Sequence, residues 1–400
     1  MPPPQRTFVR SEFSPALPPP LNVAGPFAWV RANLFNSVLS SILTLLSIAF
    51  ILWITPGLVR WLLIDAVWSA PDGDACRAPG AGACWAYVRA KITFFTYGAY
   101  PRDALWRVDL TLVMGAGLAM WLLWPDWPRK GIAAVLFFAI YPVVAFILLH
   151  GMGDGSRAVV NAAANAFNSD VLRDVARNSL PIIGTHLWGG IFVSLLVATV
   201  GIVVSLPMGV LLALGRQSRA PFIRFFCIVL IEVVRGVPLI TVLFMANTML
   251  PLFVPDAWTP DRLMRPLIGV ALFASVYMAE VVRGGLQAVP RGQHEGAMAL
   301  GLSQSKMMRL IVMPQALTIV IPGIVNSFIA LFKDTTLVAI VGVFDFLRAI
   351  DTQRLDPAWN GPTISTTGYA FAAMFYFVFC FAMSRYSLMM ERRLAHGRKR

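Results

Sequence analysis

Residues 280–314 read EVVRGGLQAVPRGQHEGAMALGLSQSKMMRLIVMP, a polar stretch punctuated by glycines that separates two long apolar runs. Pro290 and Gly292 are expected to end the preceding helix, because proline has no backbone N–H to donate and glycine favours helix termini. The stretch therefore predicts a polar loop between two membrane helices.

The loop itself predicts a short helix. Residues 293–300 can form two helical turns, Gly301 breaks them, and Ser303 can cap the next helix, which continues into an apolar run. A short helix with an apolar surface suits a groove on another protein. The side chains expected on that surface, beside Glu295, are Ala297, Met298, Leu300 and Leu302.

Composition places the chain among membrane proteins. Hydrophobic residues make up 58% of the 400 residues, charged residues make up 13%, and the mean hydropathy is +0.69. The formal net charge is +13, but the basic residues are scattered between apolar runs and form no basic helix with interleaved aromatic residues. Nucleic acid is therefore not an expected partner, whereas membrane lipid is.

Runs of apolar residues predict an all-α fold with about eight transmembrane helices, because roughly 20 residues cross the hydrocarbon core. The expected spans are residues 37–54, 110–124, 131–149, 187–214, 225–250, 266–282, 310–332 and 366–384. Residues 337–344 are too short to span and are expected to be re-entrant or interfacial.

These spans divide the chain into five segments. The proline-rich start reads as a disordered tail rather than a cleaved signal peptide. The sequence NAAANAFNSDVLRDVARNSL within the connector suggests an amphipathic helix along the membrane surface. The expected segments are a cytoplasmic tail (1–36), three spans with a periplasmic loop at 64–108 (37–150), a periplasmic connector (151–186), a core (187–390) with its loop at 290–306, and a basic cytoplasmic tail (391–400).

Charge predicts the orientation. On this assignment Lys and Arg are about twice as dense in the inside segments, which favours cytoplasmic termini and a cytoplasmic 290–306 loop. Cys76 and Cys84 then face an oxidising periplasm, where their spacing suits a disulfide, although two reduced thiols remain an alternative. Cys227 and Cys380 lie in apolar runs and are expected to be small core residues.

Catalytic motifs are not found in the sequence. It contains no G-x-x-x-x-G-K-[ST], and His294-Glu295 is followed by Met298 where H-E-x-x-H requires a second histidine. With four histidines in all, neither a triad nor a metal cluster is expected. We therefore expect no catalytic residue, metal or cofactor in this chain.

Three features of the loop together resemble a known family signature: Glu295-Gly296-Ala297, Gly301 six residues after the glutamate, and IVMP at 311–314. They are similar to the EAA loop of binding-protein-dependent ATP-driven importers, with Gly296 and Met313 as departures. The flanks AEVVRGGLQAVPRGQ and ALFKDTTLVAIVGV resemble permeases for polar amino acids. The resemblance covers residues 187–387 and implies a type I ABC importer permease core preceded by three extra spans.

The resemblance also implies partners and a mechanism. The loop would be a coupling helix that docks on a separate ATPase subunit, which would drive alternating access. A periplasmic amino acid binding protein would deliver the solute at the bacterial inner membrane. The long amino-terminal half resembles the larger permease of general L-amino acid importers, which implies a heterodimer with a second permease. The residues expected to couple to the ATPase are Arg291, Gln293, His294, Glu295, Gly296, Ala297, Leu300 and Gly301.

Two identical pentapeptides, EVVRG at 232–236 and at 280–284, place charges near the membrane. Each sets a glutamate and an arginine three residues apart on one helix face, where an ion pair lowers the cost of burial. One interpretation is a pair within each helix that stabilises the bundle. The other is a gate or pathway lining that meets a zwitterionic solute, and the four residues are Glu232, Arg235, Glu280 and Arg283.

Lys333, Asp334 and Thr335 match the KDT element of polar amino acid permeases. A cation, an anion and a hydroxyl can together bind an α-carboxylate and an α-amino group. The alternative is a helix end with a snorkelling lysine. Pro314 and Pro322 fall in the same predicted span and would release backbone carbonyls as hinges or ligands.

Two other functions remain open from the sequence. One is a secondary amino acid transporter driven by an ion gradient, which would take up solute without an ATPase. The other is a membrane scaffold with no transport pathway.

Overall fold

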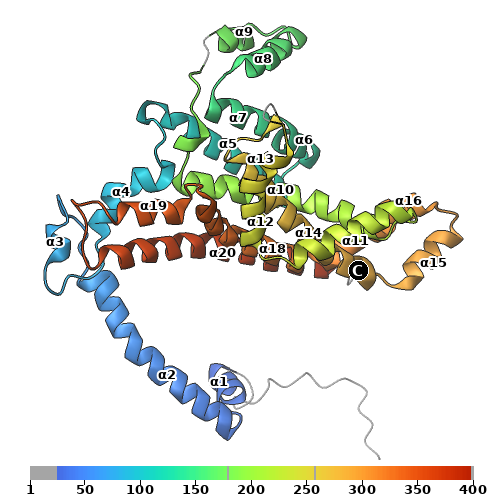
Figure 1. Ribbon diagram of the computed structural model, residues 1–400. Coiled ribbons are helices and arrows are strands. Elements are labelled where there is room, and N and C mark those ends of the chain that lie inside the picture. The colour runs from blue at the N-terminus through green and yellow to red at the C-terminus, as the bar shows by residue number, and fades with distance from the viewer. Residues whose placement is uncertain (1–24, 178–179, 256–257, 398–400) are drawn as a thin grey trace, which may run out of the picture. The chain divides into compact units, whose positions relative to one another are not determined.

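All regular elements in the part of the chain that the structure describes are helices (Figure 1). This structure is a computed structural model and describes residues 25–177, 180–255 and 258–397. Seven helices are long and apolar enough to cross a membrane, and a bent helix pair makes an eighth if it is counted as one span. The predicted all-helical membrane fold is therefore confirmed.

The chain divides into two units. The first comprises residues 1–66 and 80–83, and it holds α1 (Pro26–Leu34) and α2 (Val38–Val59), which a π turn extends to Ile64. The Ser37 side chain accepts a hydrogen bond from the Ser40 N–H and so caps α2, at the start expected from the sequence.

The second unit comprises residues 67–79 and 84–400. Its helices are α3 (Asp74–Arg77), α4 (Trp85–Tyr97), α5 (Leu105–Leu123), α6 (Lys130–Val135), α7 (Tyr141–His150), α8 (Asp154–Ala166), α9 (Asp170–Arg177), α10 (Gly190–Arg216), α11 (Pro221–Arg235), α12 (Leu239–Phe244), α13 (Leu250–Phe253), α14 (Met264–Ala288), α15 (Arg291–Ala299), α16 (Gln304–Met307), α17 (Met313–Ile319), α18 (Ile321–Asp334), α19 (Phe346–Gln353) and α20 (Ile364–Gly397).

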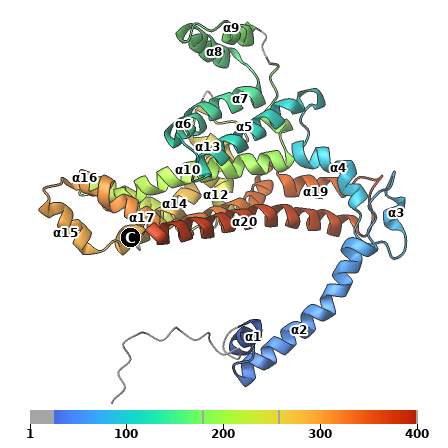
Figure 2. The same ribbon diagram turned by 180° about the vertical axis from the view of Figure 1, so that it is seen from behind.

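The pair α10 and α14 forms the centre of this unit. Glycines allow the two helices to approach closely, since a Cβ at Gly209 would lie 2.7 Å from Met278 and one at Gly201 would lie 3.3 Å from Val270. Figures 1 and 2 show α15 beyond one end of this pair and α4 and α19 at the other. Within this unit, α4 and α19 therefore lie at the end of α10 and α14 opposite the predicted loop.

The fifth predicted span is broken. The sequence predicted one helix over residues 225–250, but α11 ends at Arg235 and α12 begins at Leu239, with a bend of 110° between the two helical arms. Pro238 explains the break, because it donates no backbone hydrogen bond and disfavours helical geometry at Val237.

The seventh predicted span is displaced toward the carboxy terminus. Residues 310–332 were expected to form one helix, but the chain breaks at Val320 between α17 and α18. Pro314 and Pro322 each lie in the first turn of one of these helices, where proline is tolerated. The apolar helix that can span runs from Ile321 to Val341, so residues 337–341 of the segment expected to be too short form its end.

The connector contains two helices instead of one. Asn168, with φ of 45°, separates α8 from α9. Asparagine tolerates this left-handed geometry better than most residues, which explains why the predicted continuous helix is wrong. A position along the membrane surface stays a prediction.

Candidate functional site

α15 is a two-turn helix set between two sharp changes of chain direction. α14 ends at Ala288, and Pro290 is the residue that precedes α15. Gly292 was expected to end the earlier helix, but it lies inside α15, so proline alone provides this break. Gly301, with φ of +72°, ends α15 in the left-handed region that glycine occupies without strain.

Local hydrogen bonds fix the end of α15 and the start of α16. The Gly301 N–H donates to the Met298 carbonyl at 2.9 Å, and the Leu302 N–H donates to the Ala297 carbonyl at 3.1 Å. These bonds satisfy carbonyls that the end of a helix leaves unpaired. The Ser303 side chain accepts from the Lys306 N–H, as the sequence predicted, and α16 begins there.

α15 presents one face outward and anchors the other. Met298 is 58% exposed and Leu300 is 79% exposed, whereas Ala297 is only 2% exposed. Ala297 was expected on the outer surface, but it packs in an apolar cluster that includes Met307 and Val312. The difference arises because a two-turn helix must bury one stripe to be held in place. The remaining predicted coupling residues are exposed, apart from half-buried His294: Arg291, Gln293, Glu295, Gly296 and Gly301.

A polar contact adds to this anchoring. Gln315 Nε2 in α17 donates to Gln293 Oε1 in α15 at 3.0 Å. α15 is thus joined by packing and by a hydrogen bond to the helices that follow it. A force applied to its exposed face would therefore reach α16 and α17.

A cluster of charged side chains lies at the same end of the bundle, where α10, α11 and α14 meet. The Glu280 carboxylate, 16% exposed, contacts three arginines: Arg216 Nη1 at 2.8 Å, Arg283 Nη2 at 2.7 Å and Arg235 Nη1 at 3.4 Å. Arg216 also pairs with Glu232 at 3.0 Å. We call these five residues the arginine–glutamate network.

The two EVVRG pentapeptides play different roles in this network. Glu280 pairs within its own helix with Arg283, as one sequence interpretation predicted. Glu232 pairs instead with Arg216 of α10, and Arg235 crosses from α11 to reach Glu280 of α14. The network therefore ties three helices together, and the prediction of equivalent pairs within the helices is wrong for the first pentapeptide.

Sequence reasoning missed Arg216. It lies at the end of a long apolar run, where a basic residue reads as an ordinary boundary of a membrane span. A signal was nevertheless available, because the predicted topology places the end of residues 187–214 beside both pentapeptides. Two glutamates near a membrane need cationic partners, and Arg216 was one of the cations left unassigned.

The Lys333–Asp334–Thr335 element lies deeper in the bundle. The ring of the preceding Phe332 lies 5.3 Å from that of Tyr376 and 5.4 Å from that of Phe379, near the middle of α20. Lys333 is exposed and Asp334 is half-buried. Thr335 is buried, and its hydroxyl donates to the Phe332 carbonyl at 2.8 Å. The hydroxyl is thus used within its own helix, and a role for Lys333 and Asp334 in the solute pathway stays a prediction.

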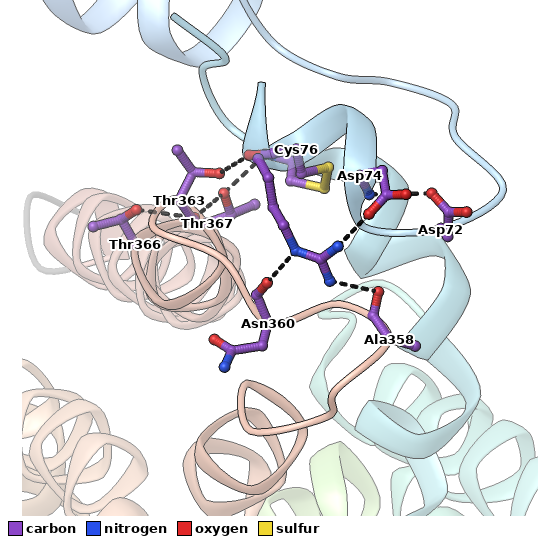
Figure 3. The surroundings of a disulfide bond; sticks show 10 residues. Asp72, Asp74, Cys76, Ala358, Asn360, Thr363, Thr366 and Thr367 are labelled. Carbon is purple, nitrogen blue, oxygen red and sulfur yellow. Dashed lines mark hydrogen bonds and ion pairs between the residues drawn. A yellow bond between two sulfur atoms is a disulfide. The ribbon is translucent and has the colours of Figure 1, made fainter. Parts of the chain in front are cut away.

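Cys76 and Cys84 form a disulfide that closes a loop onto the start of α20 (Figure 3). Both cysteines are fully buried, and the Cys84 N–H donates to Thr367 Oγ1 at 2.9 Å. Arg77 Nε donates to the Asn360 carbonyl at 2.7 Å. The loop therefore holds the connection between α19 and α20.

The two other cysteines differ from each other. Cys227 is buried, as expected for a core residue. Cys380 is only half-buried, so the sequence overstated its burial. It lies midway along α20, one face of which is open to the surroundings, as the exposed neighbours Phe377 and Phe381 indicate.

Some known proteins match about half of this chain, and others match almost all of it. Residues 205–396 match the family described as "Binding-protein-dependent transport system inner membrane component", and this match includes α15 and the whole arginine–glutamate network. A shorter relative, the glutamate/aspartate import permease protein GltK of Escherichia coli O157:H7, is 29% identical over 52% of this chain and 94% of its own length.

Two relatives are similar over almost their whole length. The inner membrane amino-acid ABC transporter permease protein YhdY of Escherichia coli K12 is 42% identical, over 96% of this chain and 97% of the relative. The glutamate/glutamine/aspartate/asparagine transport system permease protein BztC of Rhodobacter capsulatus is 40% identical, over 97% and 98%. The resemblance noted in the sequence is therefore confirmed: the chain belongs to the inner membrane components of binding-protein-dependent transport systems, among the amino-acid ABC importer permeases.

Proposed function

We propose that this chain is the transmembrane permease subunit of an ATP-driven importer of polar L-amino acids, and that α15 is the helix that receives the work of a separate ATPase. The observation that carries this proposal is the placement of α15. It is a short helix with Met298 and Leu300 exposed, and it is anchored through Ala297 to the helices around it. An amphipathic helix of this kind fits a groove on a soluble partner.

The arginine–glutamate network supports the next step, which is transmission. α14 leads directly into α15, and Glu280 lies about two helical turns before the end of α14. Its ion pairs join α14 to α10 and α11. A displacement of α15 would then move three helices as one body, which is what alternating access between two conformations requires.

The solute pathway is proposed to include Lys333 and Asp334. A cation and an anion at mid-depth suit the carboxylate and ammonium groups of an amino acid, and charges at this depth mark solute pathways in membrane proteins. The name of one relative that matches almost the whole chain, BztC, includes glutamate, glutamine, aspartate and asparagine. Polar amino acids are therefore the proposed substrate class.

The proposed assembly has further members. A second, related permease would complete the membrane dimer, two ATPase subunits would bind ATP, and a soluble binding protein would deliver solute on the side opposite α15. The orientation proposed from charge places α15 and both termini in the cytoplasm of a bacterial cell and the disulfide loop in the periplasm.

The test compares two substitutions that each add one positive charge at an exposed position near the same end of the bundle. Leu300→Arg lies on the proposed docking face, and Gln217→Arg lies in the turn after α10. With all partner subunits reconstituted in vesicles, Leu300→Arg should abolish ATPase binding and amino acid uptake, whereas Gln217→Arg should leave both unchanged.

Two results would overturn the proposal. Leu300→Arg could bind the ATPase and import as well as the unsubstituted chain, which would remove α15 from the docking site. Alternatively, vesicles holding this chain alone could accumulate amino acid under an ion gradient, which would identify a secondary transporter.

A further inference from the structure

Residues that come before the core in the sequence hold α20 at both of its ends. We call residues 67–79 and 84–150 the amino-terminal segment, and they belong to the same unit as α20. A helix rises about 1.5 Å per residue, so the part of α20 from Thr367 to Arg393 spans about 40 Å. A bilayer with its headgroups is about 40–45 Å thick. Contacts at these two positions therefore lie on opposite sides of the membrane.

The end of α20 that is remote from α15 is fixed by the loop that the disulfide closes (Figure 3). The Cys84 N–H donates to Thr367 Oγ1 at 2.9 Å. Gly73 packs against the connection between α19 and α20, where its N–H donates to the Ala358 carbonyl at 3.1 Å. A Cβ at Gly73 would lie 2.6 Å from the same oxygen. This close backbone contact leaves little room for the connection to shift.

α4 joins this end of α20 to the start of α10. The rings of Phe95 in α4 and Phe371 in α20 lie 6.1 Å apart. On the side of α10, a Cβ at Gly190 would lie 2.2 Å from the Phe95 carbonyl oxygen, and one at Gly98 would lie 2.6 Å from the Cα of Gly189. α10 and α20 are therefore fastened to each other through α4 at the end remote from α15.

At the end near α15 the two helices have different partners. Arg393 of α20 pairs with both carboxylate oxygens of Asp126, in the turn between α5 and α6, at 3.1 and 3.2 Å. The Tyr386 hydroxyl donates to the Leu123 carbonyl at 3.0 Å. α10 ends instead at Arg216, which belongs to the arginine–glutamate network with α11 and α14. At this end the amino-terminal segment holds α20, and the network holds α10.

We propose that the amino-terminal segment keeps α20 in a fixed position during transport, and that the end of α10 near α15 swings relative to α20. The joint for this movement is the remote end, where α4 fastens the two helices together. Packed helices move as bodies about a few joints. The inference rests on the proposed function, because it requires that work received by α15 moves the arginine–glutamate network. Asp126 and Arg393 are then positioning residues for α20.

The test measures distances between pairs of spin labels by double electron–electron resonance. The complete importer, with all partner subunits, is placed in phosphatidylcholine nanodiscs, and Cys227 and Cys380 of this chain are replaced by alanine. Labels at Trp127→Cys and Leu388→Cys report α20 against the α5–α6 turn, without removing the ion pair. Labels at Gln217→Cys and Leu388→Cys report the end of α10 against α20. All three positions are exposed.

Each pair is measured without nucleotide and with ATP held by an ATPase partner that cannot hydrolyse it. The Gln217–Leu388 distance should shift on ATP binding, whereas the Trp127–Leu388 distance should stay the same. A third pair, Arg89→Cys in α4 with Leu355→Cys after α19, reports the fastened end and should also stay the same.

Charge reversal tests the positioning role of the ion pair. Asp126→Arg places two like charges side by side, so the Trp127–Leu388 distance should broaden and the rate of uptake should fall several-fold. ATPase binding should be unchanged, because α15 is untouched. Asp126→Arg combined with Arg393→Asp restores opposite charges and should return both the distance and the rate.

Three results would overturn the proposal. ATP could change the Trp127–Leu388 distance as much as the Gln217–Leu388 distance, or it could change neither in a preparation that imports amino acid. Asp126→Arg could also leave both the distance and the uptake unchanged. A preparation that contains every partner and imports nothing would instead refute the proposed function, and this inference with it, so the two failures are distinguishable.

Discussion

The two identical EVVRG pentapeptides allow a controlled test of the arginine–glutamate network, because the same substitution can be made in both. Glu280→Gln and Glu232→Gln make the same chemical change in the same local sequence. Glu280 is 16% exposed and contacts three arginines, whereas Glu232 is 53% exposed and pairs with Arg216. If local sequence determined the effect, the two variants would lose the same stability.

The structure predicts different losses. Glu280 accepts one hydrogen bond from Arg216 and two from Arg283. A hydrogen bond to a charged group contributes about 1.5–3 kcal/mol, but such contributions are not additive, and breaking a buried ion pair costs about 3–5 kcal/mol in total. The three arginines remain 26–37% exposed, so we expect the low end, about 3 kcal/mol. For Glu232 we expect about 0.5 kcal/mol, as for an exposed pair.

The assay is the free energy of unfolding in mixed micelles, with sodium dodecyl sulfate as denaturant and tryptophan fluorescence as the signal. Glu280→Gln should lower this free energy several-fold more than Glu232→Gln does. Equal losses for the two variants, or no loss for Glu280→Gln, would refute the inference that the second pentapeptide is the centre of the network.

Three further predictions concern other parts of the chain. Gly296→Ala should stabilise α15 by about 1 kcal/mol, because open space surrounds the position. Gly301→Ala should destabilise α15 by about 1 kcal/mol, because φ at Gly301 is +72°. Amide hydrogen exchange of α15 measures both effects, and a change of the same sign in the two variants would contradict the reasoning. Burial raises the pKa of Asp345 to about 6 from an unfolded value of 3.8, so its stabilising contribution is present below pH 3.8 and is lost as the pH rises through about 6. Unfolding should cost about 2 kcal/mol less at pH 7 than at pH 4, and Asp345→Asn should flatten this dependence. Joint replacement of Cys76 and Cys84 by serine should lower the free energy of unfolding by about 2–3 kcal/mol, and alkylation of both thiols in intact cells without reductant would instead exclude the disulfide.

Local sequence signals predicted α15 well because every one of them acts within a few residues. Pro290, Gly301 and Ser303 each determine backbone geometry or one hydrogen bond at their own position. Ala297 was misplaced for the opposite reason. Which face of a two-turn helix is buried depends on Met307 and Val312, and sequence spacing alone does not show that these residues lie beside it.

Proline and glycine in the sequence indicate that a membrane helix can break, but they do not give the angle of the bend. Gly236 and Pro238 lie on either side of Val237, and each favours a break, yet hydropathy alone bridges residues 225–250 as one span. Hydropathy measures whether a segment is apolar, and it carries no information about a bend of 110°. The same limit explains why residues 337–341 were separated from the helix that they complete.

The arginine–glutamate network could not be predicted from the sequence, because it depends on how three helices pack. Identical pentapeptides have identical propensities, so the difference between them comes from the packing around each one. Arg216 reaches both glutamates, Glu280 at 2.8 Å and Glu232 at 3.0 Å, whereas Arg235 and Arg283 contact Glu280, which is therefore the buried centre. A site assembled from three helices is therefore recognised only when their packing is known.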